Sequence, residues 1–237
     1  MKGRIWELDA FRGICILGMF GVHFVYDLVE LYALVDWTYP PFFSLIKNWG
    51  GVLFLLLSGV CVTLGSHPVR RGLIVALCGM LCTAVTWGMY RFAFAGKGII
   101  IYFGILHCLG LCMLLWPLCR RLPTGAIGIL GLILVGVGLW FDSVSVETPY
   151  LVPLGLTFQG FVSSDYFPLL PNLGFFLLGA FLGRTFYRNK ESRIPGVNAG
   201  NPLVRFLGWS GRQSLFIYLL HQPILTGFFE LYQLLKK

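Results

Sequence analysis

Arg12 and His23 are the side chains of the first apolar segment best suited to chemistry. They stand eleven residues apart, and an α-helix advances by about 100° and 1.5 Å per residue, so they point the same way, roughly 16 Å apart. Asp9 and Asp27 lie at helical contact spacing from Arg12 and His23. Because charged groups inside a bilayer are costly and usually functional, the spacing predicts a functional polar stripe on a membrane-spanning helix. The alternative is that the charges mark the helix entrance and that His23 is a packed core side chain.

Two further histidines, His107 and His221, fall near the middle of other apolar segments, whereas His67 falls in a turn. Three imidazoles at a common depth, with His23, indicate a functional grouping, or they can hydrogen-bond across helices as packing groups. Both interpretations stay open for His107 and His221. A metal site is less favoured, because no His-x3-His pair fixes two ligands together.

Short polar islands interrupt the same apolar segments. They are Ser58-Gly59, Asp165 and Ser214. Ser214 precedes His221 by seven residues, about two helical turns, so both could face one cavity. No elbow motif surrounds either serine, which argues against a Ser-His nucleophile.

The composition is that of an integral membrane protein. Of 237 residues, 57% are hydrophobic and 12% charged, whereas soluble domains carry about 25% charged residues. The mean hydropathy is +0.79. No cleavable signal is predicted, because the first apolar run begins with a charged motif. The net charge of +8 is interpreted as membrane topology and not as nucleic-acid binding.

The seven cysteines are interpreted as small packing residues, because they lie in or beside apolar runs with no charged neighbour that would favour thiolates. Neither a disulfide framework nor a metal site is expected.

The apolar pattern predicts an all-α, polytopic helix bundle in one domain, 1–237. Seven spans are expected, each near the roughly 20 residues that cross a bilayer: 10–33, 49–66, 71–94, 98–117, 124–141, 166–187 and 213–234. Residues 145–164 contain Pro149 and Pro153 and are predicted to form a loop, or a re-entrant eighth element. Residues 188–212 are predicted to be an irregular polar loop.

Basic residues predict a cytoplasmic N-terminus and an external C-terminus. The segments then assigned to the inside hold most of the cations: Lys2, Arg4, Arg70, Arg71, Arg120, Arg121, Arg184, Arg188, Lys190, Arg193, Arg205 and Arg212. The outside segments hold few: Lys47, Arg91, Lys97, Lys236 and Lys237.

Five motifs, in order, resemble one family. They are RIWELDAFRGICILGMFGVHFVYDL (4–28), FLLLSG (54–59), FGILHCLGL (103–111), DYFPLLPNLGFFLLGAFLG (165–183) and SLFIYLLHQP (214–223). Together they are similar to bacterial relatives of heparan-α-glucosaminide N-acetyltransferase, in the transmembrane acyltransferase superfamily, over essentially the whole chain. One departure is Asn172, where an aromatic residue is common in such proteins. The chain is also shorter than the lysosomal enzyme and lacks its extra spans and luminal domain.

The resemblance implies transfer of an acetyl group from cytosolic acetyl-CoA to an amine or hydroxyl of a sugar or glycan at the outer face. His23 would be the general base, or would itself take the acetyl group in a ping-pong scheme, and Asp27 would orient it. The expected site residues fall into two further groups. Those for acetyl-CoA are Asp9, Arg12, Ser58, Gly59, Arg70, Arg71 and His107; those for the acceptor are Asp165, Ser214 and His221.

Two other classes use the same residues. A transporter or channel could use the polar stripe as a proton or substrate path, although no pair of broken helices is evident in the sequence. A structural membrane protein could use them as buried polar contacts. The expected partners are acetyl-CoA, a glycan or amino-sugar acceptor and the lipid of a bacterial cytoplasmic membrane, with no nucleic acid. The chain could also form a homodimer.

Overall fold

The computed structural model describes residues 5–92, 94–194 and 201–236, in which every regular element is a helix. The predicted all-α membrane class is therefore confirmed. The α-helices of the described residues are α1 (Trp6–Tyr26), α2 (Pro41–Leu64), α3 (Pro68–Arg91), α4 (Ile105–Cys119), α5 (Thr124–Phe141), α6 (Leu169–Phe186), α7 (Pro202–Arg212) and α8 (Ser214–Lys236). Shorter elements are the π-helix η1 (Asp27–Leu31) and the 3-10 helices η2 (Lys97–Ile99) and η3 (Pro149–Leu154).

Five helical segments of the described residues are long and apolar enough to cross a membrane: Trp6–Leu31, which joins α1 to η1, and α2, α3, α5 and α6. Of the other two predicted spans, α4 is apolar but has only 15 residues, and α8 has 23 residues but is not among these five. The chain is an integral membrane protein. Its orientation in the membrane stays a prediction. Three of the basic residues on which that prediction depends lie outside the described residues: Lys2, Arg4 and Lys237.

Contacts group the chain into two compact units, Met1–Phe54 with Lys190–Lys237, and Leu55–Asn189. We call them unit 1 and unit 2. The single domain over 1–237 stays a prediction.

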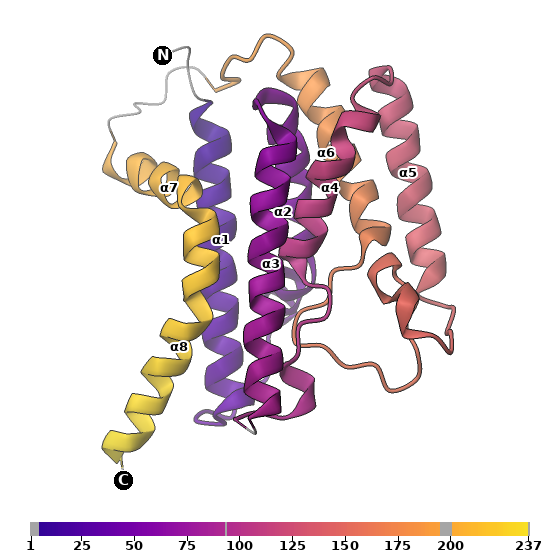
Figure 1. The fold of residues 1–237 in the computed structure, drawn as a ribbon. Coiled ribbons are helices and arrows are strands. Elements are labelled where there is room, and N and C mark those ends of the chain that lie inside the picture. Colours follow the sequence, from indigo (N-terminus) through magenta and orange to yellow (C-terminus); the bar gives the residue numbers. More distant parts are fainter. Residues whose placement is uncertain (1–4, 93, 195–200, 237) are drawn as a thin grey trace. The chain divides into compact units, whose positions relative to one another are not determined.

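In unit 1, α7 and α8 both pack on α1 (Figure 1). Glycines permit the close approach of α7. A side chain at Gly13 would overlap the backbone of Leu207, and one at Gly211 would overlap the carbonyl of Asp9. The backbones of α1 and α7 therefore touch directly, next to Arg12.

The helix α7 corrects the prediction that residues 188–212 form an irregular loop. The Asn201 side chain accepts a hydrogen bond from Leu203 N (2.9 Å), and Pro202 occupies the first turn, so the helix has a capped start. Its small residues Ser210 and Gly211 are buried. The Pro, Gly and Asn content of this short segment predicts irregular structure, but packing on α1 makes it helical.

The first turn of α1 is anchored by Glu7, which is buried. Its carboxylate accepts hydrogen bonds from Ser192 Oγ (2.8 Å) and Arg193 N (2.7 Å). The segment after α6 is thereby attached to the start of α1.

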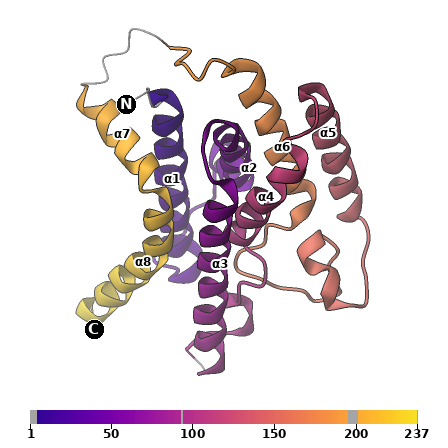
Figure 2. The same ribbon diagram turned by 45° about the horizontal axis from the view of Figure 1, so that its top comes forward.

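Unit 2 is built from two close helix pairs, α3 with α4 and α5 with α6, and both pairs can be followed in Figure 2. The part of α2 in this unit meets α6, because a side chain at Gly59 would overlap the Phe176 carbonyl and one at Gly179 would overlap that of Leu56.

Two helices of unit 2 begin later than predicted. The predicted span 98–117 is α-helical only from Ile105, and the predicted span 166–187 only from Leu169, with a non-helical residue at Leu170. Extended residues precede both helices and meet in a short parallel bridge between Phe103 and Tyr166. Hydropathy marks these residues as apolar but does not report their backbone conformation. Both helices therefore begin later than hydropathy indicates, and α6 contains a non-helical residue in its first turn.

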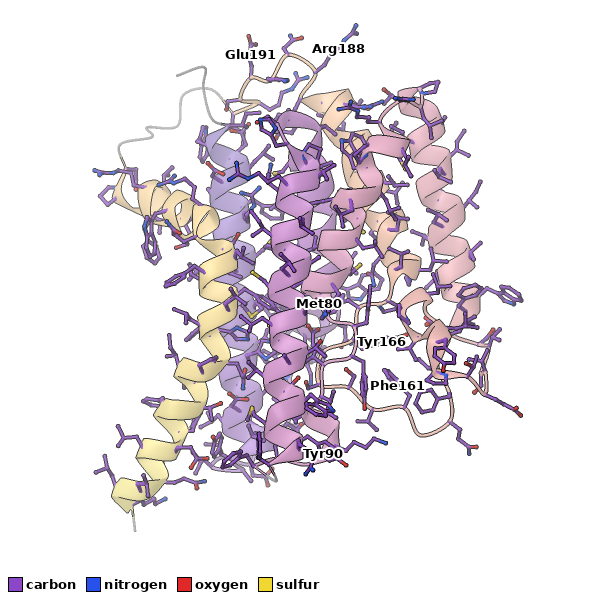
Figure 3. The ribbon with its side chains drawn as sticks, viewed as in Figure 1. Met80, Tyr90, Phe161, Tyr166, Arg188 and Glu191 are labelled. Atoms are coloured by element: carbon purple, nitrogen blue, oxygen red, sulfur yellow. The ribbon has the colours of Figure 1, made fainter. Side chains whose placement is uncertain are left out.

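Residues 145–164 form no α-helix, in agreement with the predicted loop. The loop folds onto the start of α6: Tyr166 Oη donates to the Val152 carbonyl (2.8 Å), and the rings of Phe161 and Tyr166 lie 4.9 Å apart, as Figure 3 allows the reader to follow.

Candidate active site

The centre of the candidate site is a pair of histidines in unit 1. The ring centroids of His23, in the last turn of α1, and His221, in α8, are 4.8 Å apart with the rings tilted by 58°. His221 is buried and His23 is half-buried. The structure thus brings together two residues that lie almost 200 positions apart in the sequence.

The ring of His221 has a defined orientation. Its Nδ1 contacts the carbonyl oxygen of Tyr218. Because a carbonyl can only accept, Nδ1 carries the hydrogen and Nε2 of a neutral His221 is left with a lone pair. The second imidazole can therefore accept a proton or a hydrogen bond at Nε2.

Asp27 lies one turn beyond His23 and is almost fully buried, with 1% of its surface exposed. Both carboxylate oxygens contact Gln222 Nε2, at 3.0 and 3.3 Å. Asp27 also opens the π-helix η1, which replaces the regular turn predicted up to residue 33. Such π-turns are frequent at functional sites. Consecutive residues of α8, His221 and Gln222, thus meet His23 and Asp27 of the first span.

At the other end of α1, Arg12 pairs with Asp9, its Nη1 lying 3.5 Å from Oδ1. Both side chains are 17% exposed. Since α1 is continuous over Trp6–Tyr26, the separation of roughly 16 Å between Arg12 and His23 applies. The long ion-pair distance and partial exposure leave the guanidinium donors available for a further anion.

In unit 2, His107 is engaged by the protein on both ring nitrogens. Gly104 N donates to Nδ1 (3.2 Å), so Nε2 carries the hydrogen and lies 3.3 Å from Thr83 Oγ1. Thr83 in turn donates to the Ile101 carbonyl (2.6 Å). This network fixes the extended backbone before α4, which supports a structural role for His107. Its contact with acetyl-CoA stays a prediction.

The Asp165 carboxylate caps the same helix. Its Oδ2 accepts from Ile105 N (3.0 Å), where a carboxylate is favourable because it faces free N–H groups and the positive end of the helix dipole. Asn172, the departure from the family pattern, donates from Nδ2 to the Pro168 carbonyl (2.7 Å) at the interrupted start of α6. Both side chains compensate broken backbone hydrogen bonding.

The other predicted site residues lie on several elements, and their roles stay predictions. Ser58 is buried beside Gly59, at the contact of α2 with α6. Arg70 and Arg71 are exposed in the first turn of α3, and Ser214 is the first residue of α8. Among the described residues, no group of three or more His, Cys, Asp or Glu side chains could hold a metal ion.

Sequence reasoning missed Gln222 and the anchoring role of Glu7. Gln222 carried a signal, because a glutamine beside a histidine in an apolar helix must find a buried partner. The partner of Glu7 has no sequence signal, since Ser192 and Arg193 lie in a loop far along the chain.

A search against protein families matches residues 4–223 to the model described as heparan-alpha-glucosaminide N-acetyltransferase, catalytic. No curated protein and no solved structure matches the chain significantly.

Proposed function

Because the chain belongs to the heparan-alpha-glucosaminide N-acetyltransferase catalytic family, a family of membrane acyltransferases, we propose that it transfers an acetyl group from cytosolic acetyl-CoA to a sugar or glycan at the outer face of a bacterial cytoplasmic membrane. The observation that supports this most is the contact of His23 with His221 beside the buried Asp27. In this proposal His23 is the general base.

The residues would move one proton from the acceptor to the CoA thiolate. His23 takes the proton of the acceptor amine or hydroxyl as the new bond to the acetyl carbon forms and the carbon–sulfur bond breaks. The proton then passes to the departing CoA thiolate. The lone pair on Nε2 of His221 can stabilise a charged His23 or share its proton.

Asp27 favours an amine over a hydroxyl acceptor. A buried carboxylate whose polar partner is a neutral amide is poorly compensated for its lost hydration. An acceptor amine that arrives as an ammonium ion would supply the missing charge next to His23 on binding. It would then lose one proton to Asp27 or to solvent before the neutral amine attacks, and His23 would take the second proton as the bond forms. We therefore infer that an amino sugar is the better acceptor.

Acetyl-CoA is polyanionic, so its nucleotide requires cations. Arg12 fits this role because its Asp9 partner is distant and the pair is partly exposed. The pantetheine arm would follow α1 over about three turns toward His23. By the positive-inside argument Arg70 and Arg71 belong to the same side of the membrane, and we propose them as further phosphate contacts.

Arg12→Ala should weaken acetyl-CoA binding by about tenfold at low salt and by less at high salt, because charge pairs at an open rim are screened. Titration calorimetry over a salt series measures this. Asp9→Asn separates the two predicted contacts: if Asp9 acts only by pairing with Arg12, freeing the guanidinium should not weaken binding. A dissociation constant that is unchanged in Arg12→Ala at every salt concentration would assign Arg12 to pairing with Asp9 alone.

Gln222→Leu should destabilise the protein by about 1–3 kcal/mol, because it leaves the Asp27 carboxylate buried without its donor. Gln233→Leu, on the same helix, is the control. The double variant Asp27→Asn with Gln222→Glu restores an amide–carboxylate pair in reverse. It should recover thermal stability but not acetyl transfer, since the charge has moved away from His23's helix. Recovery of both would make the pair purely structural.

A transporter remains the second candidate, and the extended backbone before α4 and the non-helical residue at the start of α6 are the observations that favour it. Incubation of the purified protein with acetyl-CoA and glucosamine separates the two. The proposal expects N-acetylglucosamine and free CoA in equal amounts by mass spectrometry. Uptake of glucosamine into vesicles without acetylation would favour transport instead.

A further inference from the structure

Four aromatic rings and one ammonium group form a connected cluster just beyond the candidate site. Lys47 Nζ lies 5.2 Å from the ring centroid of Tyr26 and 5.1 Å from that of Tyr39. Tyr39 stacks on Phe43 (5.0 Å), and Trp37 meets both Tyr39 (5.8 Å) and Phe43 (5.7 Å). We call these five residues the aromatic cluster. It lies entirely within unit 1.

The cluster adjoins the reacting groups through the chain itself. Tyr26 is the last residue of α1, directly before Asp27 and three residues after His23. Three residues of helix rise by about 4.5 Å. A ligand whose reacting group is at His23 therefore needs only one further unit to reach Tyr26.

Part of the cluster is exposed, and its buried part carries a hydroxyl group. Trp37 is 43% exposed and Tyr26 is 41% exposed. The Tyr39 hydroxyl is buried, and the Glu30 carboxylate lies close enough to interact with it. Burial, and next the nearby Glu30 carboxylate, raise the pKa of this phenol, so it remains a neutral hydroxyl. A phenol that donates to a carboxylate keeps lone pairs with which it can accept a hydrogen bond from a ligand hydroxyl.

Membrane proteins often carry aromatic residues at the interface, where single rings anchor in the headgroup region. The aromatic cluster differs because three of its rings contact one another and an ammonium group lies over two tyrosines, Tyr39 and Tyr26. Such an array offers an apolar aromatic face with a few placed polar groups, the composition of a ligand site. A pyranose ring has a matching face, because its axial C–H bonds form an apolar side and its hydroxyls a polar edge.

We propose that the aromatic cluster is a binding subsite for the sugar next to the reacting one, so that the acceptor is an oligosaccharide rather than a free monosaccharide. The subsite rests on the proposed function, since it presumes that the acceptor's terminal sugar reaches His23. Trp37 supplies the stacking face, and Lys47 and Tyr39 supply hydrogen bonds to the sugar hydroxyls.

The test compares two acceptors, glucosamine and its β-1,4-linked trimer, on Trp37→Ala. The KM for the trimer should rise by about tenfold, the value of one lost aromatic contact, while the KM for glucosamine stays unchanged. Trp49→Ala is the matched control, because Trp49 is 53% exposed on the same unit and takes no part in the cluster's ring contacts. Tyr39→Phe, which removes only the hydroxyl, should give a smaller rise and keeps the test valid if Trp37→Ala is unstable.

Direct binding of the trimer, measured by calorimetry without acetyl-CoA, separates this subsite from the proposed reaction. Trimer binding that is lost in Trp37→Ala supports the subsite even if no acetyl transfer occurs. Acetyl transfer with the same KM for the trimer in wild type and in both Trp37→Ala and Tyr39→Phe would overturn it and leave the reaction intact. Absence of any trimer binding would also overturn it, and Trp37 would then be an interfacial anchor.

Discussion

Replacing His23 with alanine should lower acetyl transfer by roughly 10²- to 10⁴-fold, the contribution of a general base. Acetyl-CoA binding should be unchanged, because the predicted nucleotide contact, Arg12, lies about three turns away on α1. The measurement is the rate of N-acetylglucosamine formation, together with the acetyl-CoA dissociation constant and the thermal midpoint of each variant.

His107→Ala is the control for the loss of a structural histidine. Both His107 nitrogens hold the start of α4, so its loss should cost about 1–3 kcal/mol of stability while transfer persists in the folded protein. His221→Ala should lower transfer less than His23→Ala. A His23→Ala protein with a lowered thermal midpoint and a wild-type rate would show that His23 is a packing residue.

The second large effect is expected at the contact of α1 with α7. Gly13→Ala places a methyl group against the Leu207 backbone, which cannot move away as a flexible side chain can. Overpacking of this kind costs about 1–3 kcal/mol. Loss of the contact should also disturb the neighbouring Arg12 and weaken acetyl-CoA binding.

Gly18→Ala, on the same helix, is the matched control. A Cβ at Gly18 meets nothing within 4 Å, so the change should be neutral or stabilising by up to about 1 kcal/mol through helix propensity. Denaturation in mixed micelles measures both variants. Equal stabilities for Gly13→Ala and Gly18→Ala would contradict the close packing of α7 on α1.

The sequence predicted the helical class and the register of the first span, because both depend on local periodicity. The spacing of Arg12, His23 and Asp27 needed only the geometry of a continuous helix. Hydropathy does not indicate that the helix after Gly104 begins late. The backbone conformation there is set by a hydrogen bond that Thr83 donates to Ile101 and by one that Asp165 accepts from Ile105.

Side-chain partners on different helices could not be predicted from the sequence, because they too depend on tertiary contacts. His221 was expected in the site, but its contact with His23 depends on how α8 packs against α1. Gln222 was missed because its role exists only opposite Asp27. The helix α7 was missed because its stability comes from tertiary contact at Gly13 and Gly211 and not from its own propensity.

The most direct test of the central claim uses sealed proteoliposomes that contain the protein in one orientation. Acetyl-CoA with a labelled acetyl group is supplied on the side of the N-terminus, and an impermeant glucosamine trimer on the other side. The account predicts labelled trimer on the far side with wild-type protein and a loss of roughly 10²-fold or more with His23→Ala. Label that reaches the trimer at the same rate with His23→Ala, or only when both substrates are on one side, would contradict it.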